Sequence, residues 1–163
     1  MIQKKICMLG AAGVGKTSLV SRFVKSMFFE DYHSTIGVKV DRKSLSVDGV
    51  DYGLLLWDLA GEDEFVTVQD SYLRGTAGCL LVVDGTRPQT LDTAIQLRER
   101  AITVAGPVPF VLVLNKADLT DTWALDASSV DRLVADGLPA MKTSAKTGDN
   151  VEAAFVKIVR LLK

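Results

Sequence analysis

The sequence lacks the long hydrophobic runs and the blocks of like charge that mark membrane proteins and polyelectrolyte-binding proteins. Its apolar stretches, such as residues 79–83 and 110–114, are far shorter than the ~18 residues that a membrane helix needs, so we interpret them as buried strands. The 19 basic and 20 acidic residues give a formal net charge of −1, and no acidic or basic block reaches five residues. Charge therefore favours neither nucleic acid nor anionic lipid as a partner.

Cysteine is also scarce, with two residues in the chain. Cys7 and Cys79 both lie within apolar runs, where a free thiol behaves as a small buried hydrophobe, and we prefer this interpretation to a disulfide or a redox pair. The short apolar stretch at the N-terminus is interrupted by glycines and has no convincing signal-peptide cleavage site. These features favour a cytoplasmic protein, with attachment to the surface of a membrane left open.

Composition and the order of the segments predict one folded domain over residues 1–163. The length suffices for one core but not for two ordinary domains, and 48% hydrophobic with 24% charged residues is typical of globular chains. Strand-length apolar runs alternate with segments of helical period, which predicts an α/β fold, a mostly parallel sheet with helices on both faces. Asp48-Gly49, between two strand-like runs, is a hairpin signal and predicts one antiparallel edge strand.

The expected strands and helices follow from the same periodicities. The first strand covers about residues 4–9, and the helix after the glycine-rich turn carries two i, i+4 apolar pairs, Leu19–Phe23 and Val20–Val24. Asp149 or Asn150 is expected to cap a final amphipathic helix that begins near Val151. The other expected elements are strands at 78–84, 110–115 and 139–143 and helices near 89–104 and 128–136.

The segment from Gly10 to Thr17, GAAGVGKT, fits the G-x-x-x-x-G-K-[ST] pattern of a phosphate-binding loop. It lies between a predicted strand and a predicted helix, where backbone N–H groups can turn toward phosphate oxygens and the helix N-terminus adds positive potential. Lys16 would reach the terminal phosphates, and the Thr17 hydroxyl would ligate Mg²⁺, a hard cation that keeps several waters. The motif predicts a nucleotide site without choosing between adenine and guanine.

The tetrapeptide NKAD, with Asn115, Lys116 and Asp118, favours guanine. It follows an apolar strand and so lies at the carboxyl end of the sheet, where such folds bind ligands. Guanine presents an N1–H and a 2-amino group side by side, and one carboxylate accepts both, whereas adenine has no such pair of donors. Taken alone, NKAD is more often a simple turn, so its weight comes from its combination with the phosphate loop.

Five motifs occur in order: the phosphate loop, Thr35 within YHSTIG, DLAG at 58–61, NKAD, and TSAKTG at 143–148. With them, the sequence resembles the Ras superfamily of small GTPases across essentially its whole length. The stretches YHSTIGVKV, WDLAGEDEF, SYLRGTAG and VVDGTRP are most similar to the Rab branch. The fold that this resemblance implies is a P-loop small G domain with a six-stranded, mostly parallel sheet.

The resemblance also implies a role for each matching residue. Phe28 would stack against the guanine, Ala145 would offer a backbone N–H to its O6 atom, and Ser144 and Lys146 would support the base loop. Gly61 would donate its N–H to the γ-phosphate. The implied nucleotide-binding positions are Gly13, Val14, Gly15, Lys16, Thr17, Ser18, Phe28, Thr35, Gly61, Asn115, Lys116, Asp118, Ser144, Ala145 and Lys146.

The implied metal ligands are Thr17, Thr35 and, through a bound water, Asp58. Thr35 would also touch the γ-phosphate with its backbone, as Gly61 would with its N–H, so that loss of this phosphate would release both switch segments. The implied catalytic set is Lys16, Thr35, Gly61 and Glu62.

Glu62 is the most consequential departure from the family pattern, because most members carry there a glutamine that orients the attacking water. An ionised carboxylate accepts hydrogen bonds but cannot donate one to the γ-phosphate, and like unit charges ~4 Å apart repel by roughly 4 kcal/mol at an effective dielectric of ~20. We therefore expect Glu62 to point outward and intrinsic hydrolysis to be slow, with a partner that supplies an arginine or repositions the water. A general-base role for Glu62 is a competing hypothesis.

Two further departures leave alternatives open. Val40 replaces an aromatic residue common in Rab-like members, whereas Trp57 and Tyr72 match two members of their surface triad, so an effector patch and ordinary packing are equally good interpretations. Ala12 would crowd an incoming arginine, or it is harmless variation.

The remaining polar positions carry less information. The sole histidine, His33, is interpreted as solvated in the first switch, and Asp63 and Glu64 as surface charge. No cysteine lies near Lys163, so the chain as given cannot be prenylated. Either a C-terminal tail is absent from this sequence or the protein works without a lipid of its own.

Together these observations predict a molecular switch that binds guanine nucleotide and hydrolyses GTP slowly by in-line attack of water. Effectors, exchange factors and activating proteins would bind through residues 30–40 and 60–74. One alternative is a nucleotide-binding scaffold with negligible turnover, such as a G domain excised from a larger protein. The other is an ATP-dependent P-loop enzyme, which NKAD disfavours.

Overall fold

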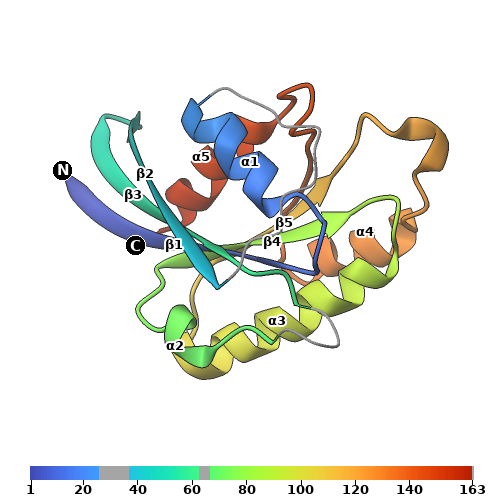
Figure 1. Cartoon of the computed structure of the whole chain (residues 1–163), viewed down its shortest axis with the longest axis horizontal. Helices are drawn as coiled ribbons and strands as arrows, with labels where there is room; N and C mark the ends of the chain where they lie inside the picture. The colour runs from blue at the N-terminus through green and yellow to red at the C-terminus, as the bar shows by residue number, and fades with distance from the viewer. Residues whose placement is uncertain (26–36, 63–66, 163) are drawn as a thin grey trace.

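The computed structural model describes residues 1–25, 37–62 and 67–162, and these residues form a six-stranded sheet flanked by helices (Figure 1). The strand order is β2-β3-β1-β4-β5-β6; β2 pairs antiparallel with β3, and every other pair is parallel. The predicted sheet with one antiparallel edge strand is confirmed. The elements are β1 (Ile2–Gly10), α1 (Lys16–Lys25), β2 (Val38–Val47), β3 (Val50–Leu59), α2 (Asp70–Leu73), β4 (Gly78–Asp84), α3 (Gln89–Ala105), β5 (Phe110–Asn115), the short 3₁₀ helix η1 (Thr120–Thr122), α4 (Ala127–Ala135), β6 (Ala140–Lys142) and α5 (Val151–Leu161).

Helices cover both faces of the sheet, with α1 and α5 on one side and α3 and α4 on the other (Figure 1). Successive residues of a strand point to opposite faces. On β1, Ile6 and Met8 therefore join the core under α1 and α5, whereas Cys7 and Leu9 join the core under α3. Burial on both faces explains why β4 and β5 read as continuous apolar runs.

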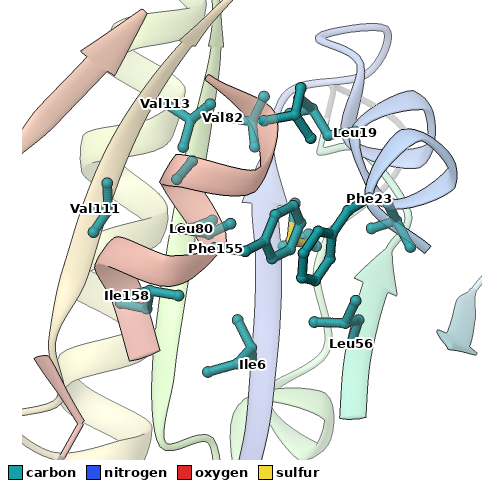
Figure 2. Packing of buried hydrophobic residues seen from close by; sticks show 14 of the residues in the cluster. Ile6, Leu19, Phe23, Leu56, Leu80, Val82, Val111, Val113, Phe155 and Ile158 are labelled. Atoms are coloured by element: carbon teal, nitrogen blue, oxygen red, sulfur yellow. The ribbon is translucent and has the colours of Figure 1, made fainter. Parts of the chain in front are cut away.

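The core under α1 and α5 is centred on two stacked aromatic rings. Phe23 of α1 and Phe155 of α5 lie with ring centroids 4.0 Å apart and planes 4° from parallel (Figure 2). Phe23 belongs to one of the i, i+4 pairs expected from the sequence, and both pairs pack against this core. The ring pair ties α1, which carries the phosphate-loop lysine, to the helix at the end of the chain.

The two cysteines lie opposite each other on neighbouring strands, Cys7 on β1 and Cys79 on β4. Both are buried free thiols, as the sequence predicts. A hydrogen bond between the two sulfur atoms raises the pKa of Cys79 and lowers the pKa of Cys7.

The cap of the last helix differs from the prediction. Asn150 occupies the N-cap position of α5, but it has a left-handed backbone, with φ of 58°, and makes no side-chain capping bond. Its side-chain amide donates instead to the Lys142 carbonyl at 2.9 Å, so it fastens the helix start to β6. The short elements α2 and η1 were not predicted because three or four residues are too few to show a period. Among the described residues, no helix is long and apolar enough to cross a membrane.

Replacing Phe155 with alanine tests the stacked core. We expect Phe155→Ala to lower the free energy of unfolding by about 3–5 kcal/mol, because the change removes a buried ring and leaves a cavity beside Phe23. Urea denaturation followed by circular dichroism measures the effect. Val134→Ala, at a position of α4 that is 46% exposed, is the control and should change stability by less than about 0.5 kcal/mol. Equal effects of the two substitutions would contradict the assignment of this core.

Candidate functional site

The predicted phosphate loop connects the end of β1 at Gly10 to the start of α1 at Lys16. Lys16 is buried, and its ammonium donates to the carbonyls of Gly10 (3.2 Å) and Ala11 (3.0 Å), so its side chain folds back along the loop. Burial lowers the pKa of Lys16 to about 8; Asp58 opposes this shift and Arg87 adds to it. The loop therefore holds a desolvated cation, which an anionic ligand would compensate.

Gly15 marks the closest approach of this loop to the NKAD motif. Its backbone has φ of 103°, and a Cβ atom there would lie 2.3 Å from Asn115 Nδ2. That amide nitrogen donates to the Val14 carbonyl at 3.0 Å. Glycine is required at position 15 because the side chain of Asn115 occupies the space that any Cβ would need.

Lys116 makes a second link between the phosphate loop and the NKAD motif. Its ammonium donates to the Gly13 carbonyl at 2.9 Å and pairs with the Asp84 carboxylate, also at 2.9 Å. Asn115 ends β5 and Lys116 follows it, and Asp84 ends β4, so the contacts link three neighbouring strand ends. The sequence treats the phosphate loop and NKAD as separate motifs, and the structure joins them into one hydrogen-bonded unit.

The segment after β6 closes over the same strand ends. Asn115 Oδ1 accepts hydrogen bonds from Thr143 Oγ1 at 3.1 Å and from the Ala145 N–H at 3.3 Å. Asp118 Oδ1 accepts one from the Ser144 hydroxyl at 2.7 Å. The carboxylate that the sequence assigns to the base and the predicted base loop are thus in direct contact.

Arg22 connects α1 to this base loop from the other side. Its Nε donates to the Ala145 carbonyl at 2.8 Å, and its Nη2 donates to the Lys146 carbonyl. The guanidinium therefore holds the backbone that carries the Ala145 N–H. Sequence reasoning missed Arg22, because its partners lie more than 120 positions away and only the fold brings them together.

Two oxygen donors meet beside the phosphate loop at the end of β3. The Thr17 hydroxyl donates to Asp58 Oδ2 at 2.6 Å, and Asp58 is buried. Among the described residues, no group of three or more His, Cys, Asp or Glu side chains could hold a metal ion by itself. A hydroxyl and a carboxylate are nevertheless the hard ligands that Mg²⁺ prefers when phosphate oxygens and waters complete its shell. The donor set fits that ion.

The DLAG segment lies directly against the phosphate loop. The Glu62 N–H donates to the Gly10 carbonyl at 3.1 Å, and the Ala12 N–H donates to the Glu62 carbonyl at 3.3 Å. A Cβ atom on Gly61 would lie 2.3 Å from Ala12 Cα, so glycine permits this approach.

The Glu62 side chain differs from the expectation that it points outward. Its side chain is only 16% exposed, and its carboxylate pairs with Arg100 of α3 at 2.8 Å. The arginine of the same chain favours the charged form of this partly buried carboxylate, whereas a phosphate would disfavour it. Arg100 was not singled out from the sequence, because nothing in its helical segment distinguishes it from a solvated arginine.

Asp84 and Arg87 were also missed. Asp84 is buried at the end of β4, and its carboxylate accepts from the backbone and hydroxyl of Thr86 as well as from Arg87 Nε at 3.0 Å. Arg87 Nη2 then donates to the Ala12 carbonyl at 2.8 Å. A carboxylate at the end of an apolar strand is the signal that drew attention to NKAD, and the same argument would have found Asp84.

The structure brings together most of the sequence-predicted site. The assembled positions lie on the phosphate loop and α1, at the end of β3, and on the segments after β5 and β6; they are Gly13, Val14, Gly15, Lys16, Thr17, Ser18, Asp58, Gly61, Glu62, Asn115, Lys116, Asp118, Ser144, Ala145 and Lys146. Phe28 and Thr35 lie outside the described residues. So do His33, Asp63 and Glu64.

The proposed surface triad has both packed and exposed members. The rings of Trp57 and Tyr72 lie 6.4 Å apart at 50°, and Lys5 Nζ lies 3.7 Å from the Trp57 ring centroid. Val40 faces Trp57 across the β2–β3 ladder and is 44% exposed. The two rings pack against each other, and Val40 leaves an apolar side chain at the surface beside them.

Comparison with known proteins agrees with this geometry. A family model described as the Ras family matches residues 5–163. Ras-related protein Rab-4B of Homo sapiens is 36% identical over 160 residues, which cover 97% of this chain and 75% of the relative. Ras-related protein RABD2a of Arabidopsis thaliana is 36% identical over 161 residues, covering 98% and 79%. The chain therefore belongs to the Ras family of small GTPases and is a Rab-like, GTP-binding member.

Asp84 offers a test of the network beneath the site. Burial raises its pKa, but hydrogen bonds from Thr86, Lys116 and Arg87 outweigh this and lower it to about 2. The ionised form therefore stabilises the fold above about pH 4, and this contribution is lost as pH falls toward 2.

We expect Asp84→Asn to lower the free energy of unfolding by about 1–2 kcal/mol at pH 7, with allowance for solvent screening. The difference from the parent should shrink between pH 4 and pH 2 in urea denaturation. Asp131→Asn, at an exposed position of α4, is the control. A difference that stayed constant with pH would rule out an ionised Asp84 as its source.

Proposed function

We propose that the residues assembled at the carboxyl ends of β1, β3, β5 and β6 bind a guanine nucleotide in one continuous site. The observation that supports this most is the pair of hydrogen bonds from Asn115 and Lys116 to the carbonyls of Val14 and Gly13. Base recognition and phosphate recognition then use one rigid unit. Asp118 would accept the N1–H and 2-amino hydrogens of guanine, with Ser144 holding its carboxylate.

Phosphate binding would fall to Lys16 and the N–H groups of residues 13–18. Lys16 is already buried with a lowered pKa, so a polyphosphate would replace the loop carbonyls as its partner and restore full charge. Thr17, Thr35 and, through water, Asp58 would hold Mg²⁺, which when bound neutralises phosphate charge. Thr35 and Gly61 would contact the γ-phosphate, and Phe28 would stack on the base.

Hydrolysis would proceed by in-line attack of water on the γ-phosphate. Lys16 and the backbone N–H of Gly61 would stabilise the charge that develops on the phosphate oxygens. The side chain at position 62 supplies no N–H donor, because it is a carboxylate paired with Arg100. We infer that intrinsic turnover is slow and that a partner accelerates it.

The output would be nucleotide-dependent binding of effectors and regulators through residues 30–40 and 60–74, with recruitment to a membrane through a partner or a tail. A scaffold with negligible turnover is the second candidate. The pairing of Glu62 with Arg100 favours this scaffold, because a paired carboxylate at position 62 removes one catalytic group. Multiple-turnover hydrolysis with and without cell lysate separates the two, since an activating partner accelerates only the switch.

Replacing Asp118 tests the choice of base. We expect Asp118→Ala to weaken GDP binding roughly 10- to 100-fold, because charge-assisted hydrogen bonds to the base are lost. Displacement of a fluorescent GDP analogue measures the affinity. Asp121→Ala, at an exposed carboxylate of η1, is the matched control and should bind GDP as the parent does. Parent protein that bound ADP as tightly as GDP would refute guanine specificity.

Glu62→Gln tests the assignment of slow turnover. Glutamine restores an N–H donor and removes a negative charge, so single-turnover hydrolysis of GTP should accelerate about tenfold or more, given that one preorganised donor is worth 10²–10³ in other enzymes. Rapid-quench measurement of phosphate release gives the rate. An unchanged or slower variant would overturn the assignment and favour a general-base role for Glu62.

A further inference from the structure

Glu62 is shared between two parts of the fold. Its backbone N–H and carbonyl are hydrogen-bonded to Gly10 and Ala12 of the phosphate loop. Its carboxylate lies instead on Arg100 of α3, with 2.8 Å between Oε1 and Nη1. Glu62 thus keeps its backbone at the loop and its negative charge on a residue of α3.

Arg100 holds this position with both terminal nitrogens of its guanidinium. While Nη1 binds Glu62, Nη2 donates to the Val68 carbonyl and pairs with Asp70 at 3.0 Å. Glu62 Oε1 also accepts from the Val68 N–H at 3.4 Å. Arginine presents its donors in a fixed planar fork, which a flexible lysine ammonium cannot reproduce. One side chain of α3 thus contacts Glu62, Val68 and Asp70 together.

The two ion pairs of Arg100 differ in how far the partner side chain is exposed to solvent. The Asp70 side chain is 57% exposed, and such surface pairs contribute little. The Glu62 side chain is 16% exposed and that of Arg100 is 32% exposed, so this pair is less screened by solvent. If Arg100 were absent, the Glu62 carboxylate would remain tethered at the phosphate loop without its neutralising partner.

We propose that Arg100 is a positioning residue that keeps the Glu62 carboxylate away from the γ-phosphate and so permits a triphosphate to bind beside it. This inference rests on the proposed function. Glu62 repels a γ-phosphate but has little to repel in GDP, so Arg100 acts on the preference for GTP over GDP. A purely structural role would weaken the binding of both nucleotides alike.

A double-mutant cycle on nucleotide preference tests this. The affinities of GDP and of the slowly hydrolysed analogue GTPγS are measured, with Mg²⁺, by displacement of fluorescent GDP from the parent, Arg100→Met, Glu62→Gln and the double variant. We expect Arg100→Met to lower the GTPγS-to-GDP affinity ratio roughly three- to tenfold, since a partly solvated like charge is left near the γ-phosphate. In the Glu62→Gln background the same change should alter the ratio less than about twofold. Arg100→Lys should fall between Arg100→Met and the parent.

Asp70→Asn is the matched control. It removes the exposed ion pair but leaves Glu62 and Arg100 together, so the affinity ratio should equal that of the parent. An unchanged ratio in Arg100→Met, or an equal fall in both backgrounds, would overturn the positioning role. Failure of the parent to bind GDP would instead refute the proposed function, so the two failures are distinguishable.

Discussion

The site depends on two hydrogen bonds that cross from the end of β5 to the loop after β1. Asn115 donates to the Val14 carbonyl and Lys116 to the Gly13 carbonyl. The bond to Val14 is buried, and a buried carbonyl without a partner would cost on the order of 1–3 kcal/mol, so the loop and the NKAD segment stabilise each other. The absence of a Cβ at Gly15 and the pairing of Lys116 with Asp84 are both conditions for this arrangement.

Parallel pairing explains why motifs far apart in the sequence converge. All strands except β2 point the same way, so the residues that end them share one edge of the sheet. Mutual packing then fixes side chains that would otherwise be surface charges, as with Asp84 at the end of β4. Arg22 contacts the loop after β6 and Arg100 contacts Glu62 after β3, and the two arginines come from helices on opposite faces of the sheet (Figure 1).

The architecture and most motif positions could be predicted from the sequence, because apolar period and strand–turn–helix context are local signals. Asn115 was found because it lies at the end of an apolar strand, and Asp84 could have been found in the same way. The partners of Arg22 and Arg100 could not, because a helix surface carries no mark of what another segment places against it. Glu62 illustrates the difference: its lack of an N–H donor follows from residue type, but its orientation depends on an arginine 38 positions away. Asn150 occupied its predicted position but bonded to β6, since backbone conformation decides where a side chain reaches.

Helix α1 carries Lys16 and Thr17 at its first turn and Arg22 less than two turns later. One end therefore belongs to the phosphate side of the site, and Arg22 grips the loop that carries Ala145. Because both contacts are made by one short helix, a shift of α1 moves the phosphate-side residues and the Arg22 contact together. In the proposed site, a displacement of α1 would therefore shift Lys16 and the loop that carries Ala145 together, without any contact to the nucleotide itself.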